Sequence, residues 1–138
     1  MDRTRLAAQL AIDEGKRSRI YLDSEGKWTC GIGRNLSDRA FSEDEIALMF
    51  KNDVDSAERD LDRNLPWWRA MNDARQNALA NMAFQLGIVR LLGFKKALEL
   101  LKAGRWDAAA SEFMDSKWAR QVPARAKRVT DLIRTGEF

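Results

Sequence analysis

Histidine is absent from this chain of 138 residues, and cysteine occurs once, at Cys30. The lack of histidine excludes the commonest general base, the commonest zinc ligand and every Ser–His or Cys–His nucleophile pair. A single cysteine excludes an intramolecular disulfide, which fits folding in a reducing compartment. Any catalysis must therefore depend on carboxylates, hydroxyls and cations, and we expect neither a metal site nor a cofactor.

Long apolar runs are also lacking. No segment approaches the length of a membrane span, and Met1 to Arg5 are followed by no long apolar stretch. We therefore expect no signal peptide and no signal-arrest-release anchor. The first 60 residues hold more Asp and Glu than Lys and Arg, whereas residues 61–138 hold more Lys and Arg. The basic part favours an anionic partner, although a solvated surface that keeps the protein soluble explains the charge equally well.

The apolar pattern predicts one helix followed by a hairpin at the start of the chain. Leu6 and Leu10 share a face of a helix expected over residues 4–14, which Gly15 ends. The pattern then changes to short strands on either side of the turn-like segment Asp23-Ser24-Glu25-Gly26. This arrangement is typical of an antiparallel hairpin, here within residues 19–33.

The remainder of the chain has helical spacing. Ser42 followed by Glu45 forms a capping box, which opens a helix to about residue 63. Further helices are expected over 74–86, 94–103, 106–114 and 123–134, and both prolines precede helical patterns. The prediction is a mostly helical α+β fold in one domain, residues 1–138. It has a small lobe of about residues 15–60 and a helical lobe of residues 1–14 plus 61–138, packed together with a cleft between them.

Three polar residues stand out by their positions. Glu14 ends the first helix, Asp23 lies in the hairpin turn after eight intervening residues, and Thr29 follows after five more. Strand alternation places Thr29 on one face with two glycines, and Trp28 and Cys30 on the other. We expect the glycine face to line a cleft and the Trp28 face to pack onto the core.

These residue types fit the cleavage of a glycoside. A carboxylate near a helix C-terminus faces the negative end of the dipole, which disfavours its ionised form and suits Glu14 to a general acid. A polar turn residue such as Asp23 suits the carboxylate that stays ionised, and Thr29 suits a group that holds water. Each residue also has an ordinary alternative. Glu14 and Asp23 could be surface charges, Asp23 a turn residue and Thr29 a strand residue. Spacing alone does not choose between these interpretations.

A resemblance to a known family supports the catalytic interpretation. The chain resembles the T-even bacteriophage lysozymes, the endolysins of glycoside hydrolase family 24, whose pattern is Glu, eight residues, Asp or Cys, five residues, Thr. The resemblance covers most of the chain in order. The matching residues are Ile12-Asp13-Glu14-Gly15, Ile20-Tyr21, Asp23, Glu25-Gly26, Thr29, Gly31-Ile32-Gly33, Asn81-Met82, Phe84-Gln85, Gly93-Phe94, Arg105-Trp106-Asp107, Pro123, Arg125-Ala126-Lys127-Arg128-Val129 and Arg134-Thr135-Gly136.

The resemblance implies a role for each matching residue. Glu14 matches the proton donor, Asp23 the carboxylate that steers the attacking water, and Thr29 the third catalytic member. Phe84 and Gln85 match positions near the bound saccharide, and Arg125 matches an arginine that pairs with the catalytic Glu. The implied reaction is hydrolysis of the β-1,4 bond between N-acetylmuramic acid and N-acetylglucosamine in peptidoglycan, with inversion suggested by the family.

The chain also departs from the family. Arg34 stands where a histidine often follows the Gly-Ile-Gly segment, so the ion pair there is altered. Asn35 and Ala97 replace other cleft residues, and we expect Asn35 among the substrate-binding residues. The stretch 36–41 is short, which predicts a trimmed small lobe. Among the tryptophans, we expect core packing for Trp28, Trp106 and Trp118.

Other functions stay open at this stage. The fold could serve a non-catalytic module that binds peptidoglycan or a polyanion, or a lytic transglycosylase, which needs the acid but not Asp23. The basic, amphipathic segment 117–134 could act on anionic outer-membrane or inner-membrane surfaces. We expect a monomer made in the host cytoplasm that acts in the periplasm after release by a holin, causing lysis, with peptidoglycan as its partner and no nucleic-acid partner.

Overall fold

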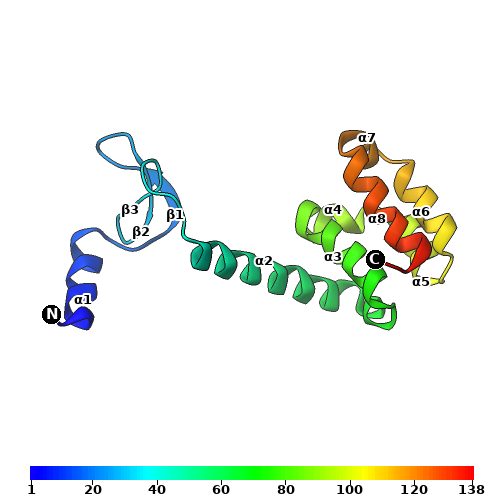
Figure 1. Cartoon of the computed structure of the whole chain (residues 1–138), viewed down its shortest axis with the longest axis horizontal. Coiled ribbons are helices and arrows are strands. Elements are labelled where there is room, and N and C mark those ends of the chain that lie inside the picture. The colour runs from blue at the N-terminus through cyan, green and yellow to red at the C-terminus, as the bar shows by residue number, and fades with distance from the viewer. The chain divides into compact units, whose positions relative to one another are not determined.

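The computed structural model describes all residues, 1–138, and divides them into two compact units, Met1–Leu48 and Met49–Phe138. Figure 1 shows the order of the elements along the chain. Helices contain 67% of the residues, and the strands form one small sheet near the N-terminus. The predicted mostly helical α+β class is therefore confirmed. The lobe boundaries predicted from the sequence, and a cleft between the lobes, stay predictions.

The first unit contains one helix and a three-stranded sheet. Its elements are α1 (Arg3–Asp13), β1 (Arg17–Leu22), β2 (Trp28–Gly31) and β3 (Arg34–Asn35). Asp2 caps α1 by accepting hydrogen bonds from two backbone N–H groups, and Gly15 follows the helix with a φ of 74°. The strands are antiparallel in the order β1-β2-β3. The predicted hairpin is confirmed, and β3 is an additional strand.

Helix α2 (Glu43–Asn64) begins in the first unit and continues in the second. The capping box predicted at its start is present. The Ser42 N–H donates to Glu45 Oε2 at 2.8 Å, and the Glu45 N–H donates to Ser42 Oγ at 3.3 Å. The backbone amides of Ser42 and Glu45 are therefore satisfied by side chains at this helix end.

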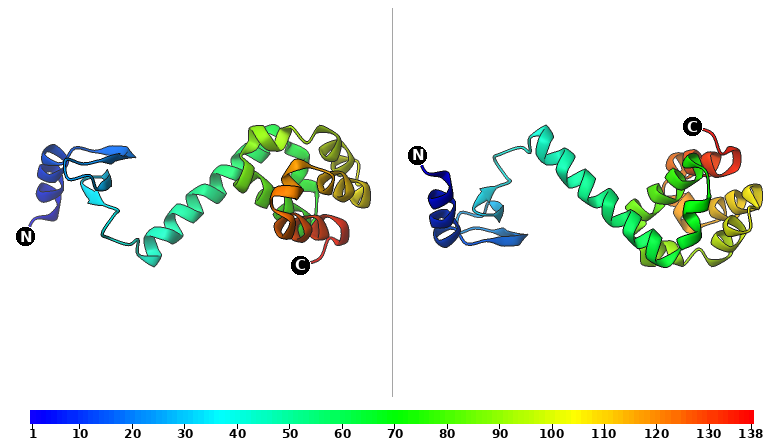
Figure 2. Two further views of the ribbon diagram at one scale, coloured as in Figure 1. Left: turned by 90° about the horizontal axis from the view of Figure 1, so that it is seen from above. Right: turned by 90° about the horizontal axis from the view of Figure 1, so that it is seen from below.

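The second unit is a helical bundle around one apolar core (Figure 2). Besides most of α2, it contains η1 (Pro66–Ala70), α3 (Asp73–Leu86), α4 (Ile88–Leu92), α5 (Lys95–Lys102), α6 (Trp106–Met114), α7 (Lys117–Gln121) and α8 (Pro123–Thr135). Helix α8 packs against α3 and α6, and α6 also packs against α5. Asn72 caps α3 by accepting from the Arg75 N–H, and Pro66 and Pro123 begin their helices as predicted.

The tryptophans divide between the units. Trp118 is buried and Trp106 packs partly buried against the core, as predicted. Trp28 is 48% exposed, because the first unit has no buried apolar side chain for it to pack against. The predicted core packing of Trp28 is therefore not met within its unit. None of the helices has both the length and the apolar composition that a membrane span requires.

Candidate active site

Glu14 lies at the point where α1 ends. Its backbone N–H donates to the Leu10 carbonyl at 2.9 Å, so Glu14 is the last residue held by the helix. The side chain is exposed within the first unit, and its carboxylate lies directly against Gly33, in the turn between β2 and β3. The helix C-terminus and this turn together place the Glu14 carboxylate.

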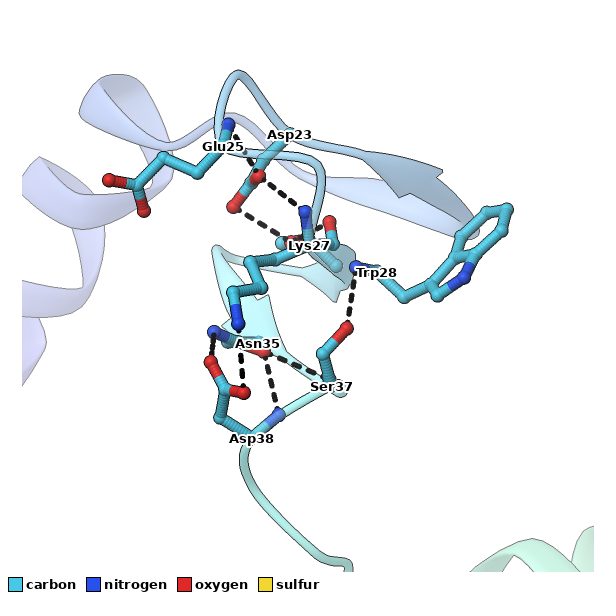
Figure 3. A network of polar contacts seen from close by, with 8 residues as sticks. Asp23, Glu25, Lys27, Trp28, Asn35, Ser37 and Asp38 are labelled. Carbon is cyan, nitrogen blue, oxygen red and sulfur yellow. Dashed lines mark hydrogen bonds and ion pairs between the residues drawn. The ribbon is translucent and has the colours of Figure 1, made fainter.

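Asp23 begins the turn between β1 and β2, and its carboxylate is held by the backbone of that turn. Asp23 Oδ1 accepts from the Glu25 N–H at 2.9 Å and from the Lys27 N–H at 2.8 Å (Figure 3). The Asp23 N–H in turn donates to the Lys27 carbonyl at 2.9 Å. A carboxylate that accepts backbone N–H groups of its own turn has its orientation fixed. Asp23 Oδ2 takes no part in this turn.

Thr29 lies in the central strand beside Asp23. It is only 4% exposed, and its Oγ1 lies 3.1 Å from the Lys27 carbonyl and 3.4 Å from Asp23 Oδ2. A hydroxyl has one proton, so it donates to one of these two acceptors at a time. When the proton goes to the Lys27 carbonyl, Asp23 Oδ2 is left to accept from another donor, such as a water. The structure therefore brings Asp23 and Thr29 together as a pair.

Arg34 forms an ion pair that ties the sheet to the start of α2. Its guanidinium donates to both Glu45 carboxylate oxygens, with Nη2 2.9 Å from Oε2, and also to the Ala40 carbonyl. The hydrogen bond from Arg34, followed by that from the Ser42 backbone, lowers the pKa of Glu45 to about 2. The predicted change of ion pairing at position 34 thus takes the form of an Arg34–Glu45 pair.

Asn35, expected to bind substrate, uses its side chain within the loop that follows β3. Its Oδ1 accepts from the Ser37 and Asp38 N–H groups at 2.9 and 3.1 Å, and its Nδ2 donates to Asp38 Oδ2 at 3.0 Å (Figure 3). Asp38 also pairs with Lys27 at 3.0 Å, and the hydrogen bond from Lys27 lowers the pKa of Asp38. Asn35 therefore closes this loop, and the second N–H of its Nδ2 group is the donor that these bonds leave over.

Phe84 and Arg125 line one cavity of about 490 Å³ in the second unit, together with Asn81. Phe84 is 44% exposed, so its ring offers an apolar surface. Arg125 Nε donates to Asn81 Oδ1 at 2.8 Å, and Arg125 Nη2 to the Asn81 carbonyl at 3.2 Å. These bonds fix the guanidinium of Arg125, which belongs to α8, against Asn81 of α3. Pairing of Arg125 with Glu14 stays a prediction.

Gln85 is fixed through a tryptophan. Its Oε1 accepts from Trp118 Nε1 at 3.0 Å, and the Trp118 ring is buried. The Nε2 group of Gln85 takes no part in this bond, and substrate binding by Gln85 stays a prediction. Ala97, in contrast, lies buried in the core of the second unit, so the cleft position expected for it offers little surface there.

Two features of the first unit were not predicted from the sequence, namely the approach of Glu14 to Gly33 and the backbone hydrogen bonds to Asp23. The approach of Glu14 to Gly33 depends on a φ of 68° at that glycine, and the backbone donors to Asp23 depend on the turn geometry. A signal for the second was present, because Asp followed three residues later by Gly is typical of a side-chain-closed turn. Nothing in the residue pattern indicated the approach of Glu14 to Gly33.

Comparisons with known proteins give one consistent family. The family model described as phage lysozyme matches residues 11–135. The chain is 32% identical to the pre-baseplate central spike protein Gp5 of Enterobacteria phage T4, over 96% of this chain and 28% of that protein. It is 30% identical to probable T4-type lysozyme 1 of Dictyostelium discoideum, over 92% of each. It is 29% identical to the peptidoglycan hydrolase gp36 of Pseudomonas phage phiKMV, over 86% of this chain and 14% of that protein.

Proposed function

The chain belongs to the phage lysozyme family, and we propose that it is a muramidase that hydrolyses the β-1,4 bond between N-acetylmuramic acid and N-acetylglucosamine in peptidoglycan. Membership of the family supports a lysozyme-type glycoside hydrolase activity. The named bond and the residues that cleave it are the proposal. The observation that supports it most is the Asp23 carboxylate, whose Oδ1 is fixed by two backbone N–H groups and whose Oδ2 lies 3.4 Å from Thr29 Oγ1.

In the proposed reaction Glu14 donates a proton to the glycosidic oxygen as the bond to the anomeric carbon breaks. Asp23 Oδ2 and Thr29 Oγ1 hold a water, and Asp23 accepts its proton as the water oxygen attacks the anomeric carbon. One water is consumed, and a new reducing end is formed. We propose inversion at that carbon, as the family resemblance suggests, with Phe84, Gln85 and Asn35 as saccharide contacts and Arg125 as a supporting cation.

The proposal is tested by replacing the acid. We expect Glu14→Gln to lower the rate of lysis of chloroform-treated Gram-negative cells by about 10²- to 10⁴-fold, because the amide cannot donate the proton. The matched control is Glu25→Gln, since Glu25 contributes only its backbone N–H to the Asp23 turn. Near-full activity of Glu14→Gln would contradict the proposal.

The alternatives give different results in the same assays. A non-catalytic binding module releases no fragments from purified peptidoglycan. A lytic transglycosylase leaves anhydro-muramyl ends, which mass spectrometry separates from hydrolytic ends. Membrane permeabilisation by the basic helix α8 and the preceding residues predicts killing that survives Glu14→Gln.

For the biological role we propose an endolysin that is made in the cytoplasm and reaches the periplasm through a holin. Host cells that produce the chain should then lyse only when a holin is produced with it. The match to a central spike protein favours a second candidate, a lysozyme module of a spike. Detection of the chain in purified phage particles would support the spike role, and its restriction to the lysate supernatant would support the endolysin role.

A further inference from the structure

Gly33 and the Glu14 side chain lie unusually close together. A Cβ atom at position 33 would lie 2.7 Å from Glu14 Oε2, 2.9 Å from Cδ and 3.0 Å from Cγ. Atoms in ordinary van der Waals contact are farther apart, so any residue with a side chain at position 33 would displace the Glu14 carboxylate. The displacement is easy, because the colliding atoms are at the far end of a flexible side chain.

The fold of the first unit produces this approach. Arg17 pairs with Gly31 at the ends of β1 and β2, so the turn that follows β2 returns toward the residues that precede β1. Glu14 is among those residues, at the end of α1. Gly33, with a φ of 68°, turns the chain into β3, where Arg34 pairs with Glu45 and Asn35 pairs with Thr29. The backbone at Gly33 is therefore held from both sides.

We propose that Gly33 is a positioning residue, whose missing Cβ leaves the space that sets the Glu14 carboxylate in the orientation needed to protonate the glycosidic oxygen. The inference rests on the proposed function of Glu14. It adds a residue that touches no substrate and acts only through the placement of the acid. Misplacement of a catalytic group by about 1 Å is enough to lower a rate about 100-fold.

Gly31 supplies a matched control from the same turn region. Its φ of 61° is close to that of Gly33, so an alanine at either position adopts a left-handed conformation with a similar backbone penalty. A Cβ at position 31, however, would meet no atom within 4 Å. The two alanine variants therefore share the backbone strain and differ in the collision with Glu14.

The experiment compares Gly33→Ala, Gly31→Ala and Glu14→Gln in the full chain, with soluble glycan strands as substrate. We expect Gly33→Ala to lower kcat about 100-fold with little change in KM. Gly31→Ala, whose methyl group lies on the expected cleft face but does not reach Glu14, should lower kcat far less. Thermal unfolding midpoints should fall by similar amounts in the two alanine variants. In a ¹³C spectrum, the carboxyl resonance of Glu14, assigned by its loss in Glu14→Gln, should move in Gly33→Ala and not in Gly31→Ala.

Other results would reject either the positioning role of Gly33 alone or the proposed function as well. Equal kcat values for the two alanine variants, or an unmoved Glu14 resonance in Gly33→Ala, would reject the positioning role while the proposed function stands. Unfolding of Gly33→Ala under conditions where Gly31→Ala stays folded would make Gly33 a structural residue and also reject the role. Full activity of Glu14→Gln would reject the proposed function, and the positioning role with it.

Discussion

Different kinds of interaction stabilise the two units of the chain, each within itself. All of the buried apolar side chains lie in residues 49–138, where they form the core of the helical unit. In residues 1–48 the one buried side chain is that of Thr29, and the contacts are hydrogen bonds and ion pairs around Asp23, Asn35 and Arg34. Apolar burial stabilises without regard to direction, whereas hydrogen bonds fix the orientation of particular groups.

The apolar core that stabilises the fold and the residues proposed for catalysis therefore lie in different units. The proposed acid and the proposed water-directing pair, Glu14 with Asp23 and Thr29, all lie in the unit held by polar contacts. Polar contacts at the surface contribute little free energy each, so this unit should open more easily than the helical unit. A reaction that depends on oriented carboxylates gains more from fixed geometry than from a large core.

The largest effect is expected in the core of the helical unit. Phe113 is 0% exposed and packs against Phe94, with ring centroids 5.5 Å apart. Phe113→Ala leaves a cavity and should lower the free energy of unfolding by about 3–5 kcal/mol, measured by urea denaturation. Val89→Ala, at an 81% exposed position of the same unit, should change it by less than about 0.5 kcal/mol. A loss below about 1 kcal/mol for Phe113→Ala would contradict the prediction that the apolar core stabilises the second unit.

A smaller effect, confined to the turn, is expected on removing the Asp23 carboxylate. Hydrogen bonds to charged groups contribute about 1.5–3 kcal/mol, so Asp23→Ala should speed hydrogen exchange at the Glu25 and Lys27 amides by about 10- to 100-fold. Asp23→Asn keeps an acceptor oxygen and should retain slow exchange, yet lose activity because an amide is a poor base. Unchanged exchange in Asp23→Ala would show that the carboxylate does not hold the turn.

The smallest effect concerns the Arg34–Glu45 pair and depends on pH. The pKa of Glu45 is lowered from 4.5 to about 2, so the pair stabilises the folded chain above pH 4.5 and that contribution is lost as the pH falls toward 2. Glu45→Gln should therefore lower the urea midpoint at neutral pH, by an amount that shrinks over this range. Glu43→Gln, on the same helical turn, is the control. A difference from wild type that stays constant with pH would contradict the prediction.

Much of the fold could be predicted because local signals set the ends of the elements. Gly15 ends α1, and Ser42 with Glu45 begins α2, each through a backbone or side-chain preference that can be read directly from the sequence. The two-residue strand β3 and the five-residue helices α4 and α7 were missed. Elements this short span little more than one hydrophobic repeat, which is too little to identify them from the sequence, and they form because tertiary contacts hold them.

The candidate site was predicted in part. The spacing and the turn composition named Asp23 and Thr29, which the structure places in contact, but their catalytic role stays a proposal. The approach of Glu14 to Gly33 could not be predicted, because it depends on two segments that the strand register brings together. The exposure of Trp28 within its own unit was not predicted, since residue type indicates burial only where the surrounding unit supplies a core.

We propose that the first unit, residues 1–48, carries the hydrolytic chemistry, with Glu14 as the acid. The most direct test is digestion of purified glycan strands in ¹⁸O-labelled water, with mass spectrometry of the products of wild type, Glu14→Gln and Glu25→Gln. We predict that wild type and Glu25→Gln release fragments whose new N-acetylmuramic acid reducing ends each contain one ¹⁸O atom, and that Glu14→Gln releases almost none. Anhydro-muramyl ends without ¹⁸O, or labelled products from Glu14→Gln at the wild-type rate, would contradict the claim.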